Sequence, residues 1–284
     1  MRSLIWSGKL VKMVSPADLP KYGKPPVVEL VCGILFESLS KFLAPHMGLL
    51  WEVFKTESPN IRQMMPLAPL IEGFDATPRS VGPLSDDFPL HPRVWFETKD
   101  GTGLIQVQRD RFLYNWKKVK PEDEYLHYEH VIGQFKNCLS QFESFLHDNE
   151  LGEIKPIQYE LTYVNHIPKG EGWNKLNEVG KVFPDISWRN GTNRFLTELE
   201  GMNVQTSFRL PERQGRLHAA IRYGIRQPDQ AILLLDLTCR GIGEDRSRSA
   251  MWQWFDLAHQ WIVRGFADLT SAEMQESTWR RSDG

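Results

Sequence analysis

The fold is decided by two consecutive stretches, RVWFETKDGTGLIQVQRDRFLYNWK (93–117) and YEHVIGQFKNCLSQFESFLH (128–147). Asp100-Gly101 is a strong hairpin signal, and residues 104–108 alternate between apolar and polar side chains. In the second stretch, apolar residues recur at helical spacing and form one stripe. We therefore predict three antiparallel strands followed by a long amphipathic helix that covers them.

Upstream of these strands, VVELVCGILF (27–36) is almost continuously apolar, which is typical of a strand buried on both faces. A short helix is predicted over 46–55, after Pro45. Residues 56–92 are rich in proline, so we expect them to be irregular.

The second half of the chain repeats this order of elements. The predicted strand, irregular crossover, three strands and helix span 157–167, 170–201, 203–210, 216–225, 231–238 and 251–264, and one helical turn is expected in the crossover near 174–179. The prediction is an α+β protein with antiparallel sheets, each covered by a long helix, built from a pseudo-duplicated strand–crossover–three strands–helix unit. We expect an irregular N-terminal arm (1–24) and two α+β halves (25–152 and 153–284), either separate or as one continuous domain.

Composition limits the classes of function. The 284 residues carry a net charge of −2, so no general attraction to nucleic acid or anionic lipid is expected. Cys32, Cys138 and Cys239 lie in apolar contexts without the spacing of a zinc site, which indicates buried thiols in a reducing compartment. The first 11 residues lack the features of a signal peptide, and no apolar run is long enough to cross a membrane. We expect a cytoplasmic protein without contact to a membrane.

Four motifs carry a resemblance to a known group of proteins: PPVVELVCGILFE (25–37), LIQVQRDRFLYNWKK (104–118), ELTYVNHIP (160–168) and WIVRGFADLTSAEMQESTW (261–279). Together they resemble a sporadically distributed family of uncharacterised prokaryotic proteins of similar length. The resemblance implies no catalytic residue. Its sporadic occurrence is the pattern of accessory components of mobile or defence-linked systems.

A first candidate site lies on the predicted hairpin. Gln106 and Gln108 share one strand face, and Arg109, Arg111 and Asn115 lie beside them. Arginine guanidinium groups on such a face could bind a phosphate or carboxylate. The alternative is a solvated sheet face with Arg109 in a turn.

A second candidate lies in the strand QYELTYVNHIP. Glu160 and His166 are six residues apart and therefore point to the same side, and a carboxylate that orients a histidine is the basis of general-base catalysis. Tyr163 and Asn165 are added as ligand-binding candidates. The alternative is a histidine bonded to the backbone near a strand end, because no nucleophile motif accompanies it.

Metal and nucleotide sites have weaker support. His127 and His130 flank Glu129 at helical spacing, without a recognised metal motif, so we expect no metal and no cofactor. Gly241-Ile242-Gly243 lacks the third glycine of a dinucleotide-binding turn. The nearby arginines Arg240, Arg246 and Arg248 make the same loop a weak candidate for anion binding.

Tryptophan is concentrated at the C-terminus. Trp252, Trp254 and Trp261 lie on the last predicted helix, where they could fill a core or form an interface with a protein partner or a second copy. The function we favour from the sequence is a non-enzymatic binding or assembly module. The alternatives are an enzyme or a nucleotide- or anion-sensing protein with its site on the sheet, and a nucleic-acid-binding protein that uses Lys117, Lys118 and Lys120 near Trp116.

Overall fold

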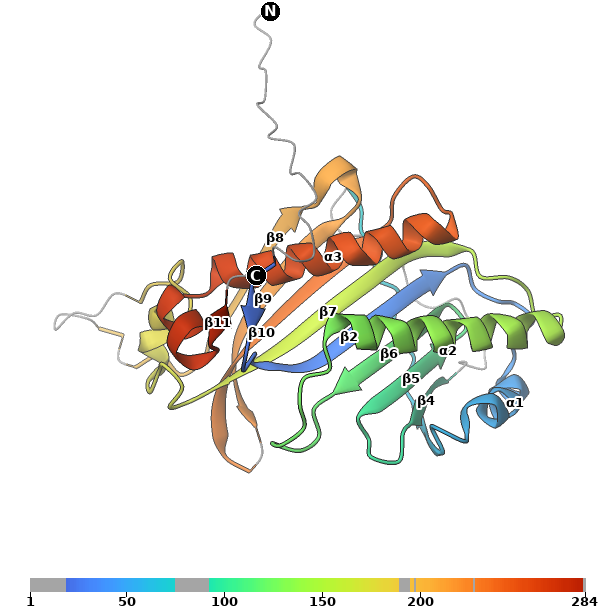
Figure 1. Cartoon of the computed structure of the whole chain (residues 1–284), viewed down its shortest axis with the longest axis horizontal. Coiled ribbons are helices and arrows are strands. Elements are labelled where there is room, and N and C mark those ends of the chain that lie inside the picture. Colours follow the sequence, from blue (N-terminus) through green and yellow to red (C-terminus); the bar gives the residue numbers. More distant parts are fainter. Residues whose placement is uncertain (1–18, 75–91, 189–194, 197, 227, 283–284) are drawn as a thin grey trace, which may run out of the picture.

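The computed structural model describes residues 19–74, 92–188, 195–196, 198–226 and 228–282. Most strands of this part belong to one large antiparallel sheet, drawn in Figure 1. Its strands are β2 (Val27–Phe36), β3 (Asn60–Met64), β4 (Arg93–Glu97), β5 (Gly103–Gln108), β6 (Arg111–Lys117), β7 (Pro156–Pro168), β8 (Asn203–Arg209), β9 (Arg216–Arg226) and β10 (Gln230–Gly241). Their order across the sheet is β3-β4-β5-β6-β2-β7-β10-β9-β8.

The sheet has the predicted repetition of elements. In each half the first strand pairs with the last strand before the long helix, β2 with β6 and β7 with β10. The two halves meet where β2 pairs antiparallel with β7, and Leu30 lies opposite Tyr163. The α+β prediction is confirmed. The halves form one sheet because β2 and β7, each at the edge of its own half, satisfy their free backbone groups by pairing with each other.

Three helices lie against this sheet. α2 (Tyr128–Asp148) packs on β6 and β2, and α3 (Arg248–Leu269) packs on β7, β10 and β9, so both long helices cover the same face (Figure 1). α1 (Ala44–Phe54) contacts β4 and α2. Aromatic rings fill the space beneath α2, where Phe112 of β6 stacks on Phe142 at 5.0 Å between ring centroids. No helix in the described part of the chain is long and apolar enough to cross a membrane.

Two segments differ from the prediction of irregular structure, whereas the 3₁₀ helix Leu176–Lys181 lies where one helical turn is predicted, near 174–179. β3 lies within the proline-rich segment and pairs with β4 at the sheet edge. In the N-terminal arm, β1 (Lys21–Tyr22) pairs with β11 (Arg281–Ser282), because the C-terminal strand supplies backbone partners that the sequence of the arm does not reveal. Residues 1–18 of the predicted arm lie outside the described residues.

The two faces of the sheet differ in chemistry. On β2 the residues that face the helices, including Leu30, Cys32 and Ile34, are almost fully buried. The opposite face carries polar and charged side chains, and residues 65–74, here called the covering segment, contact part of it. A ligand site could therefore lie on either face, and the two offer different groups.

Candidate functional site

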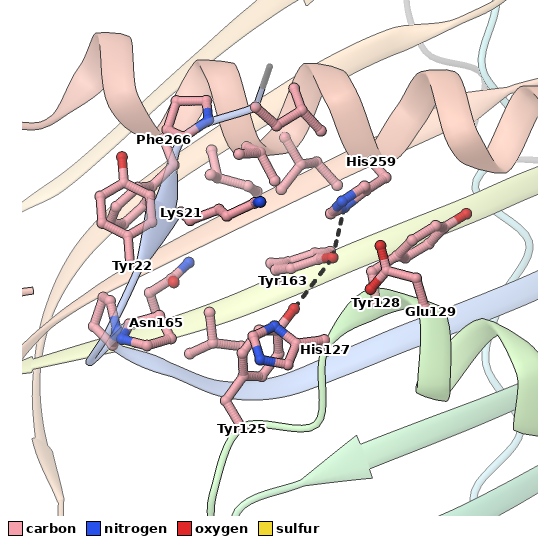
Figure 2. Close-up of a pocket in the computed structure, with 18 residues that line it drawn as sticks. Lys21, Tyr22, Tyr125, His127, Tyr128, Glu129, Tyr163, Asn165, His259 and Phe266 are labelled. Atoms are coloured by element: carbon pink, nitrogen blue, oxygen red, sulfur yellow. Dashed lines mark hydrogen bonds between the residues drawn. The ribbon is translucent and has the colours of Figure 1, made fainter. Parts of the chain in front are cut away.

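A pocket of about 250 Å³ lies on the helix-covered face, between the start of α2 and the middle of α3. β7 and β10 form its floor, and the arm around β1 forms its outer wall (Figure 2). Most of the lining is apolar, with Val27, Leu237, Ile262, Val263 and Phe266 among the contributors. Polar side chains from separate elements enter this apolar space.

Three of these polar side chains form a hydrogen-bonded chain. Tyr163 of β7 lies with its hydroxyl 2.8 Å from His259 Nδ1 of α3. The hydroxyl of Tyr125, just before α2, donates to the Tyr163 hydroxyl at 3.4 Å. Tyr128 stacks on the His259 imidazole, with 4.0 Å between centroids and 5° between planes. The stacking and the hydrogen bond together fix the orientation of the imidazole (Figure 2).

Burial sets the protonation of these groups. It lowers the pKa of His259 to about 4 and raises the pKa of Tyr163 well above its ordinary value. At neutral pH both side chains are therefore uncharged. The Tyr163 proton needs an acceptor, and His259 Nδ1 lies within reach. The imidazole then carries its proton on Nε2, which has no hydrogen-bond partner among the described residues.

The rim of the pocket carries charge. Lys21 of β1 lines the outer wall, and its side chain extends toward His259 (Figure 2). His127 and Glu129, at the start of α2, lie on the other side and are exposed. The pocket thus combines an apolar interior and the neutral donor of His259 with a rim that carries the Lys21 ammonium group on one side and the Glu129 carboxylate on the other.

The predicted polar hairpin is a buried internal network. Gln106 accepts hydrogen bonds from Arg93 and from Trp95 Nε1, at 3.0 and 2.9 Å, and donates to Asn115 at 2.8 Å. Asn115 in turn donates to Glu29 at 2.6 Å. These amides bond to one another, so this part of the sheet is neither a solvated face nor an open anion site.

The two arginines of that hairpin are also engaged within the chain. Arg109 donates to the backbone oxygen of Leu39 at 3.2 Å, and the buried Arg111 pairs with Asp110 at 3.2 Å. Neither arginine lines the pocket.

The covering segment is held on the polar face by side-chain amides. Gln108 accepts from the Leu67 backbone N–H at 2.9 Å and donates to its carbonyl oxygen at 3.1 Å. Gln158 of β7 accepts from the backbone N–H of Glu72 at 2.8 Å and donates to the carbonyl of Leu70 at 3.0 Å. The buried glutamines thus bind the backbone of this segment.

Glu72 of the covering segment lies between two basic side chains of β9. Its carboxylate is 2.8 Å from His218 Nε2 and pairs with Arg216. Burial would raise the pKa of Glu72, but the hydrogen bonds to His218 and Arg216 outweigh it and lower the pKa. Phe74 lies beneath Arg216, with the guanidinium carbon 4.6 Å from the ring centroid.

The proposed pair of Glu160 and His166 does not form. Both residues lie on the polar face, but six residues of strand separate them by about 20 Å. Glu160 accepts from Arg240 Nε at 2.6 Å, and buried His166 Nδ1 has no hydrogen-bond partner among the described residues. Burial lowers the pKa of His166, and Arg226 lowers it further. Tyr163 and Asn165 point to the opposite, helix-covered face and line the pocket.

The tryptophans of α3 have separate surroundings. Trp254 is 2% exposed and donates to the backbone oxygen of Gln214 at 2.9 Å, so it belongs to the core. Trp252 is half-buried between Lys136 and Arg248, at 4.8 and 5.2 Å from its ring centroid. Trp261 is half-buried in a groove on the other side of the helix.

The remaining candidates are dispersed. Trp116 is 2% exposed and Lys117 pairs with Glu97 at 2.9 Å, so the basic–aromatic cluster offers no exposed ring. At the start of α3, Arg248 pairs with Glu143. In the described part of the chain, no group of three or more His, Cys, Asp or Glu side chains could hold a metal ion.

Comparisons with family models, with curated proteins and with solved structures each found no match to this chain. Sequence reasoning selected Tyr163 and Asn165 of the pocket but missed His259, Tyr125 and Tyr128. Lone aromatic residues and a histidine on an amphipathic helix carry no spacing signal. Only the packing of α2 and α3 on β7 brings them together.

Proposed function

We propose that the protein binds a small amphipathic molecule in the pocket between α2, α3 and β7. The observation that carries the proposal is the chain from Tyr125 through Tyr163 to His259, which leaves an Nε2–H donor inside an apolar wall. Binding sites for small molecules are mostly apolar, with a few oriented polar groups. This pocket has that composition.

The chemistry of the polar groups favours binding over catalysis. A general base works best when its pKa lies near the working pH, and the pKa of His259 is about 4. Burial raises the pKa of Tyr163, so this phenol is a weak proton donor at neutral pH. The pair is suited to donating a hydrogen bond to a ligand.

Assembly through α3 and binding of nucleic acid have less support. An interface built on α3 would need exposed aromatic residues. Trp254 lies in the core, Trp252 is covered by two cationic side chains, and Trp261 is half-buried in its groove. Trp116, the ring named with these lysines, is 2% exposed and offers no face on which a base could stack. The pocket is therefore the better-supported site.

Titration calorimetry with two neutral probes, 2-naphthylmethanol and 1-octanol, tests the proposal. Val263→Phe adds a ring inside the pocket, and Gln253→Phe places the same ring on the exposed side of α3. We expect at least one probe to bind wild type and Gln253→Phe with equal affinity. The same probe should bind Val263→Phe at least about tenfold more weakly. Equal binding to both variants would contradict the proposal, and so would failure of wild type to bind these alcohols and also the carboxylates with the same ring or chain.

A further inference from the structure

Because the pocket combines a neutral donor with an ammonium group, we infer that its ligand is a monocarboxylate whose head group lies between Lys21 and His259. This inference rests on the proposed function and adds the chemical class of the ligand. It depends on the position of Lys21, on the charge balance at the rim and on the size of the pocket.

Lys21 is placed by a fixed strand. β1 pairs with β11, so Lys21 lies opposite Ser282 and Tyr22 lies opposite Arg281. Tyr22 anchors this strand, because its ring packs edge-on against Phe266 at 5.3 Å and its hydroxyl donates to Gln275 at 3.2 Å. The neighbouring side chain, Lys21, then extends over the pocket toward His259 (Figure 2).

The charge of Lys21 is available to a ligand. Within the described part of the chain Lys21 forms no ion pair, whereas Lys117 and Arg240 on the polar face are paired with Glu97 and Glu160. A carboxylate at this point would accept from the ammonium group and from His259 Nε2–H together. Charge-assisted hydrogen bonds of this kind are about twice as strong as neutral ones.

The other side of the rim limits the ligand to one acidic group. Glu129 lines the pocket opposite Lys21, and its carboxylate would repel a second anionic group. His259 is uncharged at neutral pH because its pKa is about 4, so Lys21 is the positive charge that faces the head group. A monoanion matches this balance better than a dianion or a phosphate.

The apolar part of the pocket limits the size of the apolar part of the ligand, here called its body. A cavity of about 150 Å³ is large enough to hold benzene. The present pocket is about 250 Å³ and is lined by Val27, Ile262 and Phe266 on its apolar side. It therefore suits a fused aromatic ring or a medium-length alkyl chain.

The test uses two matched pairs of probes, 2-naphthoate with 2-naphthylmethanol and octanoate with 1-octanol. The members of each pair share their body and differ in the charge of the head group. Calorimetry at neutral pH compares the full-length wild type with Lys21→Met, Lys21→Arg and the control Lys24→Met. Lys24 is exposed in the same arm and does not line the pocket.

We expect the carboxylate of at least one pair to bind about tenfold more tightly than its alcohol. Lys21→Met should remove this preference, and Lys21→Arg and Lys24→Met should keep it. If the alcohols bind as tightly as the acids and Lys21→Met changes nothing, the head-group assignment is wrong although the pocket still binds ligands. If none of the four probes binds wild type, the proposed function is wrong as well.

Discussion

The two faces of the sheet use polar residues in opposite ways. On the polar face, buried amides and charges bond to partners within the chain: Gln106 to Asn115, Gln108 to Leu67, and Glu72 to Arg216 and His218. On the helix-covered face, fewer polar groups enter the core, and they converge on a pocket. There Lys21 and His259 Nε2 have no partner among the described residues.

This difference distinguishes polar groups that stabilise the fold from polar groups that can bind a ligand. A buried polar group costs free energy unless it is bonded, so a network of mutually bonded groups is explained by the fold itself. The fold does not explain polar groups such as Lys21 and His259, whose hydrogen-bond donors face an apolar pocket and have no partner among the described residues. The sequence alone makes the first set more conspicuous, because Gln106, Gln108 and Arg111 form a dense polar run.

The largest effect is expected on the polar face. Glu72→Ala leaves Arg216 and His218 without their carboxylate, which is only 9% exposed, and should lower the free energy of unfolding by about 3 kcal/mol. The control Glu52→Ala removes an exposed pair with Lys55 and should cost about 0.5 kcal/mol or less. Urea unfolding measures both. Equal losses would show that the covering segment contributes little to stability.

Acid should destabilise the pocket through His259. The pKa of His259 is about 4 in the folded protein and about 6.5 in an unfolded chain, so the unfolded state binds more protons between these values. The free energy of unfolding should therefore fall as the pH decreases from about 6.5 to about 4, by about 2.5 kcal/mol from this group.

His259→Gln should remove that share of the pH dependence. His166 and Glu72 also have lowered pKa values and keep their own contributions, which act in the same direction. Urea unfolding of both proteins at several pH values gives the difference. Parallel curves for wild type and variant would contradict the protonation assigned to His259.

A smaller effect distinguishes two tyrosines of β7. Tyr163→Phe removes the donor to His259 Nδ1 and should cost about 1 kcal/mol. Tyr159→Phe is the matched control, because the buried Tyr159 hydroxyl has no hydrogen-bond partner among the described residues, and this change should be neutral or stabilising. Thermal unfolding compares them. A larger loss for Tyr159→Phe would reverse the interpretation.

The smallest effect on stability is expected at the rim of the pocket. Lys21→Met should change the free energy of unfolding by about 0.5 kcal/mol or less, because Lys21 is exposed and forms no ion pair within the described residues. The same variant should lose its preference for carboxylates. A substantial loss of stability would indicate a structural role for this lysine.

Most of the fold could be predicted from local patterns. The apolar run of β2, the alternation of β5 and the stripes of α2 and α3 report burial directly, and their boundaries agree with the structure within a few residues. β1 and β3 were missed because each depends on a strand distant in the sequence or on a sheet edge.

The site could not be predicted in the same way. Tyr163 and His259 are 96 residues apart, and their hydrogen bond exists only because α3 packs on β7. The sequence pattern also does not reveal that residues 65–74 bond to Gln108 and Gln158. These bonds occupy the Gln108 amide, which the sequence suggests as part of an anion site. Both facts depend on tertiary packing.

The most direct test of the account is the protonation of His259, observed by two-dimensional ¹⁵N–¹H NMR of the imidazole in full-length protein at neutral pH. Spectra of the free protein are compared with spectra recorded after addition of each of the four probes, and the His259→Gln variant assigns the signals. We expect a neutral ring with its proton on Nε2, and a change in the Nε2 signal when at least one of the two carboxylates is added. A proton on Nδ1, or an Nε2 signal that does not respond to any of the four probes, would contradict the proposed site.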